Sequence, residues 1–141
     1  MKILDYIYGN SIIVSYKRVI NTKLAPQAIG VYSQAIKSNG CLFSSGQIPL
    51  VPESGNIISN KIDEQIEQVF KNIRGILNSE GLDLNNITKL TVFLIDLNNF
   101  DILNKIFSEK FGDYFPARSV IEVSRLPKDS KVEIEFIANY E

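Results

Sequence analysis

The chain has 141 residues, and its 15 Lys and Arg side chains nearly balance its 16 Asp and Glu side chains, for a formal net charge of -1. This length is typical of one domain with a single core, and a near-neutral chain lacks the basic surface that duplex-binding proteins use. The absence of His and the presence of a single cysteine, Cys41, exclude His-based catalytic pairs, His-ligated metal or haem sites and an internal disulfide. We interpret Cys41, which lies among apolar residues, as structural.

The N-terminal part predicts an extension followed by a domain. Residues 1–16 contain a short, interrupted apolar stretch without a convincing signal-peptide cleavage site. We interpret them as an added strand or a loosely ordered extension to a domain at residues 17–141. No apolar run reaches the roughly 18 residues of a transmembrane helix. We therefore expect a soluble chain with no membrane partner, by default in the cytoplasm, with an organelle as the alternative.

The first half of the domain predicts strands and a loop. Residues 11–20 favour a strand or hairpin leading into the domain, and residues 32–36 favour a further strand. Asn39-Gly40 predicts a hairpin turn into a strand at 41–45. Residues 47–60 contain prolines and a turn sequence and predict a loop.

From residue 62 onward the pattern predicts helices alternating with strands. Apolar residues at intervals of three and four predict a long helix from Ile62 that ends near Gly81. Residues 89–96 predict an interior strand covered on both faces, and Asn98-Asn99 is predicted to cap a second helix. The predicted buried stripe of that helix comprises Phe100, Leu103, Ile106, Phe107 and Phe111. Residues 117–124 and 131–138 predict two final strands, the last with one buried face.

This order of elements predicts one α+β domain with both helices on one face of a sheet. The other face carries polar groups and must meet water or another subunit.

Two charged side chains in the C-terminal half could carry chemistry. Arg118 follows Pro116-Ala117, and its guanidinium offers the rigid fork of donors that binds a carboxylate. Glu133 lies on the polar face of the last strand, where a carboxylate could position a water and transfer a proton. Taken alone, each is better explained as a solvated surface side chain. Spacing does not decide between the two interpretations.

Two segments nearer the N-terminus leave a similar choice open. Ser45-Gly46 lies at a strand end where small residues permit a ligand to approach closely, although a turn is the commoner explanation. Tyr32 is either a core aromatic with its hydroxyl at the rim or the wall of a pocket. The sequence has neither G-x-x-x-x-G-K-[ST] nor G-x-G-x-x-G, which disfavours the usual nucleotide enzymes.

Several separated motifs in a fixed order are more specific than any one residue. They are, in chain order, A-I-G-V-Y-S-Q-A at 28–35, S-G-Q-I-P at 45–49, Glu64-Gln65 followed by Asn72, F-P-A-R-S at 115–119, L-P-K at 126–128 and V-E-I-E at 132–135. Together they resemble the RidA (YjgF/L-PSP) family over about residues 17–141.

The resemblance implies a chorismate-mutase-like fold, with a mixed sheet carrying two helices on one face, and a homotrimer with clefts between subunits. It implies hydrolysis of reactive enamine and imine intermediates, such as 2-iminobutanoate and 2-iminopropanoate, to 2-oxo acids and ammonia, with neither a cofactor nor a metal. By resemblance, Arg118 binds the substrate carboxylate and Glu133 orients the attacking water. The other implied pocket residues are Tyr32, Ser45, Gly46, Asn104 and Val120.

Two positions depart from the family pattern. Val31 stands where Pro is usual, and Val120 stands where Cys or Thr is common. The backbone carbonyl of Val120 could still hold the water, but a side-chain contribution is lost.

Two other functions stay open. One is an endoribonuclease or translation inhibitor acting on RNA, which the missing His and the near-neutral charge disfavour. The other is a non-catalytic trimer that binds a small carboxylate.

Overall fold

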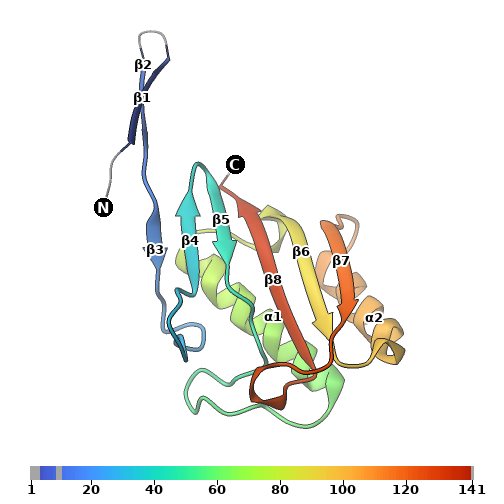
Figure 1. Ribbon diagram of the computed structural model, residues 1–141. Coiled ribbons are helices and arrows are strands. Elements are labelled where there is room, and N and C mark those ends of the chain that lie inside the picture. Colours follow the sequence, from blue (N-terminus) through green and yellow to red (C-terminus); the bar gives the residue numbers. More distant parts are fainter. Residues whose placement is uncertain (1–3, 9–10, 141) are drawn as a thin grey trace.

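The computed structural model describes residues 4–8 and 11–140, and its main body is a six-stranded sheet with two helices on one face (Figure 1). The strands of this sheet are β3 (Arg18–Ile20), β4 (Ala35–Ser38), β5 (Cys41–Ser44), β6 (Ile87–Leu94), β7 (Ala117–Glu122) and β8 (Val132–Asn139). The helices are α1 (Ile62–Ser79) and α2 (Phe100–Phe111). Three 3-10 turns, η1 (Leu84–Asn86), η2 (Leu97–Asn99) and η3 (Pro127–Asp129), precede β6, α2 and β8. The predicted α+β class is confirmed.

The strands are ordered β3-β4-β5-β8-β6-β7 across the sheet, so the last strand of the chain lies between two earlier ones. β8 pairs antiparallel with both β5 and β6, whereas β6 and β7 pair in parallel. Parallel neighbours need a crossover connection, and α2 provides it between β6 and β7. The sheet is therefore mixed, as expected.

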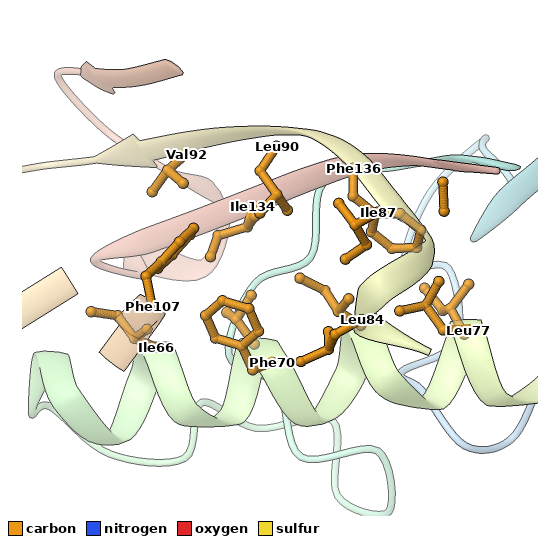
Figure 2. Packing of buried hydrophobic residues seen from close by; sticks show 14 of the residues in the cluster. Ile66, Phe70, Leu77, Leu84, Ile87, Leu90, Val92, Phe107, Ile134 and Phe136 are labelled. Atoms are coloured by element: carbon orange, nitrogen blue, oxygen red, sulfur yellow. The ribbon is translucent and has the colours of Figure 1, made fainter. Parts of the chain in front are cut away.

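The core lies between α1 and the sheet, as the helical spacing predicts. Figure 2 shows side chains of α1 directed toward those of the sheet, and the labelled residues include Ile66, Phe70, Leu77, Leu90, Ile134 and Phe136. Phe70 also meets Phe107 of α2 edge to face, with ring centroids 5.2 Å apart, which is a favoured aromatic geometry. Along β8 every second residue is buried, as predicted for a strand with one buried face.

Two buried amides hold the loop between β5 and α1. Asn72 of α1 donates from Nδ2 to the carbonyl oxygens of Ile48 and Leu50 at 3.2 and 2.9 Å, and Gln68 donates to Asn72 Oδ1 at 3.0 Å. Carbonyl groups removed from water need such partners. The motif around Asn72 is thus explained by loop packing, and residues 47–60 form the predicted loop.

The structure corrects the start of one predicted strand. The strand expected at 32–36 begins only at Ala35, because the side chain of Gln34 turns into the protein and binds backbone carbonyls of the preceding loop. The turn after this strand is predicted correctly. Asn39 and Gly40 both have positive φ, 49° and 75°, as hairpin turns that match the twist of strands require.

Three expectations around β6 and α2 are wrong in detail. β6 is fully buried only toward the helices, and Phe93 on its other face is half-buried. At the start of α2, Asn99 makes no side-chain cap bond. Asp96 instead accepts from the N–H of Asn98 at 2.9 Å and caps η2, since a carboxylate is a strong acceptor for helix N-terminal N–H groups. Phe100, expected in the buried stripe, is 39% exposed.

A separate hairpin precedes the main sheet. β1 (Leu4–Tyr8) pairs antiparallel with β2 (Ser11–Ser15), and the pair lies beyond β3 (Figure 1). β2 and β3 agree with the strand or hairpin predicted for 11–20. The division at residues 16 and 17 stays a prediction, and parts of the predicted extension, residues 1–3 and 9–10, lie outside the described residues. No helix in the described part of the chain is long and apolar enough to cross a membrane.

Candidate functional site

Most of the predicted site residues line one of two cavities. Arg118 and Asn104 line the first. The second is lined by Tyr32, Ser45, Gly46 and Glu133, together with apolar residues. The side chain of Val120, in contrast, is half-buried and packs against the core. Within one chain the predicted residues therefore form two groups and not one pocket.

The Arg118 cavity has a volume of about 460 Å³ and is lined by Asn104, Phe107, Ser108, Phe115, Pro116 and Arg118. The guanidinium extends from β7 to α2, where Nη2 donates to Asn104 Oδ1 at 2.8 Å. Its central carbon lies 4.7 Å from the ring centroid of Phe107. An amide and an aromatic face fix the direction of the guanidinium without neutralising its charge.

The charge of Arg118 has no carboxylate partner among the described residues. The ion pairs among the described residues involve other cations, such as Arg18 and Arg125. Burial lowers the pKa of Arg118 because it disfavours the charged form, yet a guanidinium stays protonated in proteins. A partly buried cation with further donors is suited to a planar carboxylate, which accepts two parallel hydrogen bonds.

The Glu133 cavity has a volume of about 400 Å³ and is lined by Ile29, Tyr32, Ser45, Gly46, Ile48, Pro127 and Glu133. Burial raises the pKa of Glu133, and the negative charge of Glu135 raises it further. A carboxyl group whose pKa is raised toward neutrality can both accept a proton and return it. This cavity can therefore supply acid and base chemistry next to apolar walls.

Gly46 allows the Glu133 carboxyl group to approach the end of β5. A Cβ atom at position 46 would lie 1.9 Å from Glu133 Oε1, well inside contact distance. The neighbouring backbone is fixed, because Gln47 and Ile134 exchange N–H to carbonyl bonds of 2.8 and 3.0 Å. The glycine is thus explained by close approach to the carboxylate.

The contacts of Tyr32 and Ser45 show how each side chain is held. Tyr32 is 47% exposed, and its hydroxyl accepts a hydrogen bond from the N–H of Ile29 at 3.1 Å, so it is a cavity wall and not a core aromatic. Ser45 donates from Oγ to the carbonyl of Ser33 at 2.6 Å, and its N–H donates to the carbonyl of Gln34 at 2.9 Å. Ser45 thus joins the end of β5 to the loop that carries Tyr32.

Arg118 and Glu133 lie on opposite faces of the sheet. In the strand register Arg118 is level with Leu90, which is buried toward the helices, whereas Glu133 is level with Phe93 on the other face. Paired residues on adjacent strands point to the same side of a sheet. One small molecule therefore cannot contact both side chains within a single chain.

A third cavity, about 760 Å³ in volume, lies between α1 and α2 and is lined by none of the predicted site residues. Opposite charges pair around it, as in Lys110 with Glu67 and Lys61 with Glu64. The carboxylates that line it, Asp63, Glu64, Glu67 and Glu109, outnumber its lysines, Lys71 and Lys105, so the cavity does not favour an anionic ligand.

Phe107 also lines the Arg118 cavity, a contribution that the sequence pattern did not predict. Helical spacing predicts this residue as core, and it is 4% exposed. The available signal is its position three residues after Asn104, since residues three apart share a helix face. The apolar walls Ile29 and Ile48 of the second cavity lie within the motifs at 28–35 and 45–49, and those motifs were the available signal for them.

Other chemistry is sparse. Cys41 is half-buried, less than expected for a core residue, and its Sγ donates to Asn139 Oδ1 at 3.7 Å. Within residues 4–8 and 11–140, no cluster of three or more His, Cys, Asp or Glu side chains is arranged to hold a metal ion.

Both cavities lie in the part of the chain that is similar to known proteins. A family model described as Endoribonuclease L-PSP matches residues 22–140. A RutC family protein of Pyrococcus abyssi is 51% identical over 122 residues, which cover 86% of this chain and 96% of that protein. Human 2-iminobutanoate/2-iminopropanoate deaminase is 43% identical over 122 residues, covering 86% and 89%. The solved structure of Escherichia coli TdcF with bound serine matches with a TM-score of 0.83 and 38% identity, covering 88% of this chain and 98% of that one.

Proposed function

The chain belongs to the RidA (YjgF/L-PSP) family, and from this premise we propose that it hydrolyses reactive 2-imino acids to 2-oxo acids and ammonia. The proposed substrates are 2-iminobutanoate and 2-iminopropanoate, which the name of the human relative includes. The observation that carries the proposal is the half-buried Arg118, oriented by Asn104 and Phe107 and paired with no carboxylate of the described residues. The serine bound to Escherichia coli TdcF supports a ligand that carries a carboxylate beside a nitrogen.

The reaction needs orientation and proton transfer. Water adds to the C=N carbon to form a carbinolamine, the nitrogen is protonated, and ammonia leaves as the carbonyl forms. In this proposal Arg118 binds the carboxylate and fixes the imine carbon. Glu133 takes a proton from the water and delivers one to the nitrogen, a role that its raised pKa favours.

We place the complete site between two copies of the chain in a homotrimer. One copy supplies Arg118 and Asn104, and the next supplies Tyr32, Gly46 and Glu133, because the sheet separates these groups within one chain. The sheet face away from the helices also carries exposed apolar side chains that a neighbour would cover, namely Val19, Phe43 and Ile121. A cyclic trimer uses both groups of every copy.

The test adds purified protein to a threonine dehydratase reaction and follows imine loss and 2-oxobutanoate formation. Wild type is expected to accelerate imine loss, and Arg118→Ala is expected not to. Arg74→Ala, which changes an exposed arginine of α1, is the matched control and should behave as wild type. No acceleration by wild type contradicts the proposal, and salt-dependent RNA binding in its place would favour the ribonuclease alternative.

A further inference from the structure

Both ends of the Gln34 side-chain amide are bonded inside the protein, where this residue is 3% exposed. Oε1 accepts from the N–H of Thr22 at 2.7 Å. Nε2 lies 2.7 Å from the carbonyl oxygen of Pro26, 3.0 Å from that of Thr22 and 3.3 Å from that of Ala25. Since an amide has two N–H groups, one of them is shared between two carbonyls. The Gln34 amide therefore bonds the N–H of Thr22 and the carbonyls of Thr22, Ala25 and Pro26, in a backbone segment that is partly removed from water. The Thr22 carbonyl also accepts from Gln27 Nε2 at 2.8 Å.

The backbone around Gln34 connects two walls of the Glu133 cavity. The Gln34 carbonyl accepts from the N–H of Ser45, and the Ser33 carbonyl accepts from Ser45 Oγ. Tyr32 lies two residues earlier, and its hydroxyl is bonded to the N–H of Ile29. The loop that Gln34 closes is therefore the loop that carries the Tyr32 ring.

The far side of this loop has a different anchor. At Gly75 of α1, a Cβ atom would lie 2.0 Å from the carbonyl oxygen of Leu24, so the loop backbone rests directly on the helix. Packing on α1 holds residue 24, while the side that faces the cavity depends on the Gln34 amide.

We propose that Gln34 is a positioning residue that holds Tyr32 and Ser45 beside Glu133 without touching substrate. This inference rests on the proposed function. Because the Arg118 cavity is built from other elements, loss of the Gln34 bonds should impair the chemical step and spare binding of the substrate carboxylate.

The test compares Gln34→Glu with Gln65→Glu. The first variant keeps the size of the side chain but places a carboxylate oxygen against three carbonyls. Gln65 is also buried, accepts from the N–H of Lys131 and donates to the carbonyl of Ser59. It lines neither cavity and bonds no residue of the loop that carries Tyr32, so Gln65→Glu disturbs a comparable amide without releasing that loop. We expect kcat to fall about tenfold or more in Gln34→Glu, with the Kd for 2-oxobutanoate within about threefold of wild type. Gln65→Glu should keep kcat within about twofold of wild type.

The proposal is overturned if Gln34→Glu keeps the kcat of wild type, or if kcat falls equally in Gln34→Glu and Gln65→Glu. Should Gln34→Glu fail to fold, Gln34→Met, which has similar length and lacks strong hydrogen-bonding groups, replaces it under the same criteria.

Hydrogen exchange measured by mass spectrometry separates this inference from the proposed function. Amides in residues 22–33 should exchange faster in Gln34→Glu, or in Gln34→Met if that variant replaces it, and not in Gln65→Glu. If wild type hydrolyses no imine while exchange changes as expected, the proposed function is wrong and Gln34 still holds the loop. Unchanged exchange overturns the role of Gln34 whatever the activity.

Discussion

The surroundings of Arg118 differ from those of Arg18 and Arg125. These two arginines form ion pairs with Glu80 and Asp129. The Arg125–Asp129 pair is exposed, and exposed pairs contribute little to stability, whereas the Glu80 side chain is largely buried. Arg118 contacts an amide and two aromatic rings instead. Burying part of a cation without a counter-charge costs free energy, which agrees with the proposed role of Arg118 in binding a carboxylate.

Arg118→Lys separates the charge from the shape of the side chain. Lysine keeps the positive charge but lacks the fork that makes two parallel bonds and the planar face that stacks on Phe107. We expect kcat/KM for 2-iminobutanoate to fall about 10- to 100-fold, the loss typical of a charge-assisted hydrogen bond. Steady-state kinetics with Arg74→Lys as the control measures this, and wild-type kcat/KM in Arg118→Lys would show that charge alone suffices.

Gly46→Ala tests the close approach of Glu133. The added Cβ atom must displace the Glu133 carboxyl group, which can swing away because it ends a flexible side chain. We expect loss of activity with a change of less than about 1 kcal/mol in the free energy of unfolding. Gly55→Ala should show the reverse, since Gly55 has φ of 69° and no atom near its missing Cβ. There we expect a cost of about 1 to 2 kcal/mol and full activity.

Glu133 also links the site to the pH dependence of stability. Its pKa is raised from 4.5 in the folded protein, so between 4.5 and the raised value the folded state binds more protons than the unfolded state. The contribution of this group to the free energy of unfolding therefore falls as pH rises through that window. We expect Glu133→Gln to be inactive yet more stable than wild type at pH 7, with an advantage that shrinks toward pH 4. Urea unfolding at both pH values measures this, and an equal advantage from Glu53→Gln, a change at an exposed loop residue, would contradict it.

At the scale of elements, periodic apolar patterns predict the positions of helices and strands accurately, because each pattern follows the one face of the element that is buried. α1 and β8 lie where their spacing predicts them. The start of β4 and the cap of η2 were not predicted, since they depend on Gln34 and Asp96 bonding to particular backbone groups.

The candidate site was predictable only in part. Residue identities such as Arg118 and Glu133 follow from the family resemblance, while spacing alone leaves both as surface charges. Their placement on opposite faces depends on β8 inserting between β5 and β6, which no local pattern specifies.

Gly75→Ala tests the contact between α1 and the loop that follows β3. Alanine is a better helix former than glycine by about 1 kcal/mol, so propensity alone predicts stabilisation. The Cβ atom would lie 2.0 Å from the backbone carbonyl of Leu24, and backbone cannot move aside as a side chain does. We expect a net loss of about 1 to 3 kcal/mol in the free energy of unfolding, whereas Asn78→Ala on the exposed face of α1 should gain a few tenths. Denaturant unfolding measures both, and stabilisation by Gly75→Ala would show that the loop yields.

At the scale of the whole molecule, the proposed homotrimer predicts active sites that are shared between neighbouring copies. Light scattering should give the mass of three chains. Arg118→Ala and Glu133→Gln, each inactive alone, should recover about a quarter of wild-type activity when equal amounts are unfolded and refolded together, because a site is intact when one chain supplies Glu133 and the other Arg118. A stable monomer, or no recovery on mixing, would contradict a site divided between copies.

The position of Arg118 and Glu133 on opposite faces of one sheet has a consequence for how activity depends on the amount of protein. If two copies complete each site, an unassembled chain, whether newly made or highly diluted, has no complete active site and hydrolyses no imine. Specific activity then rises with chain concentration until assembly is complete. The supply of chains would thus set a threshold below which reactive imines persist, which a self-sufficient monomer would not impose.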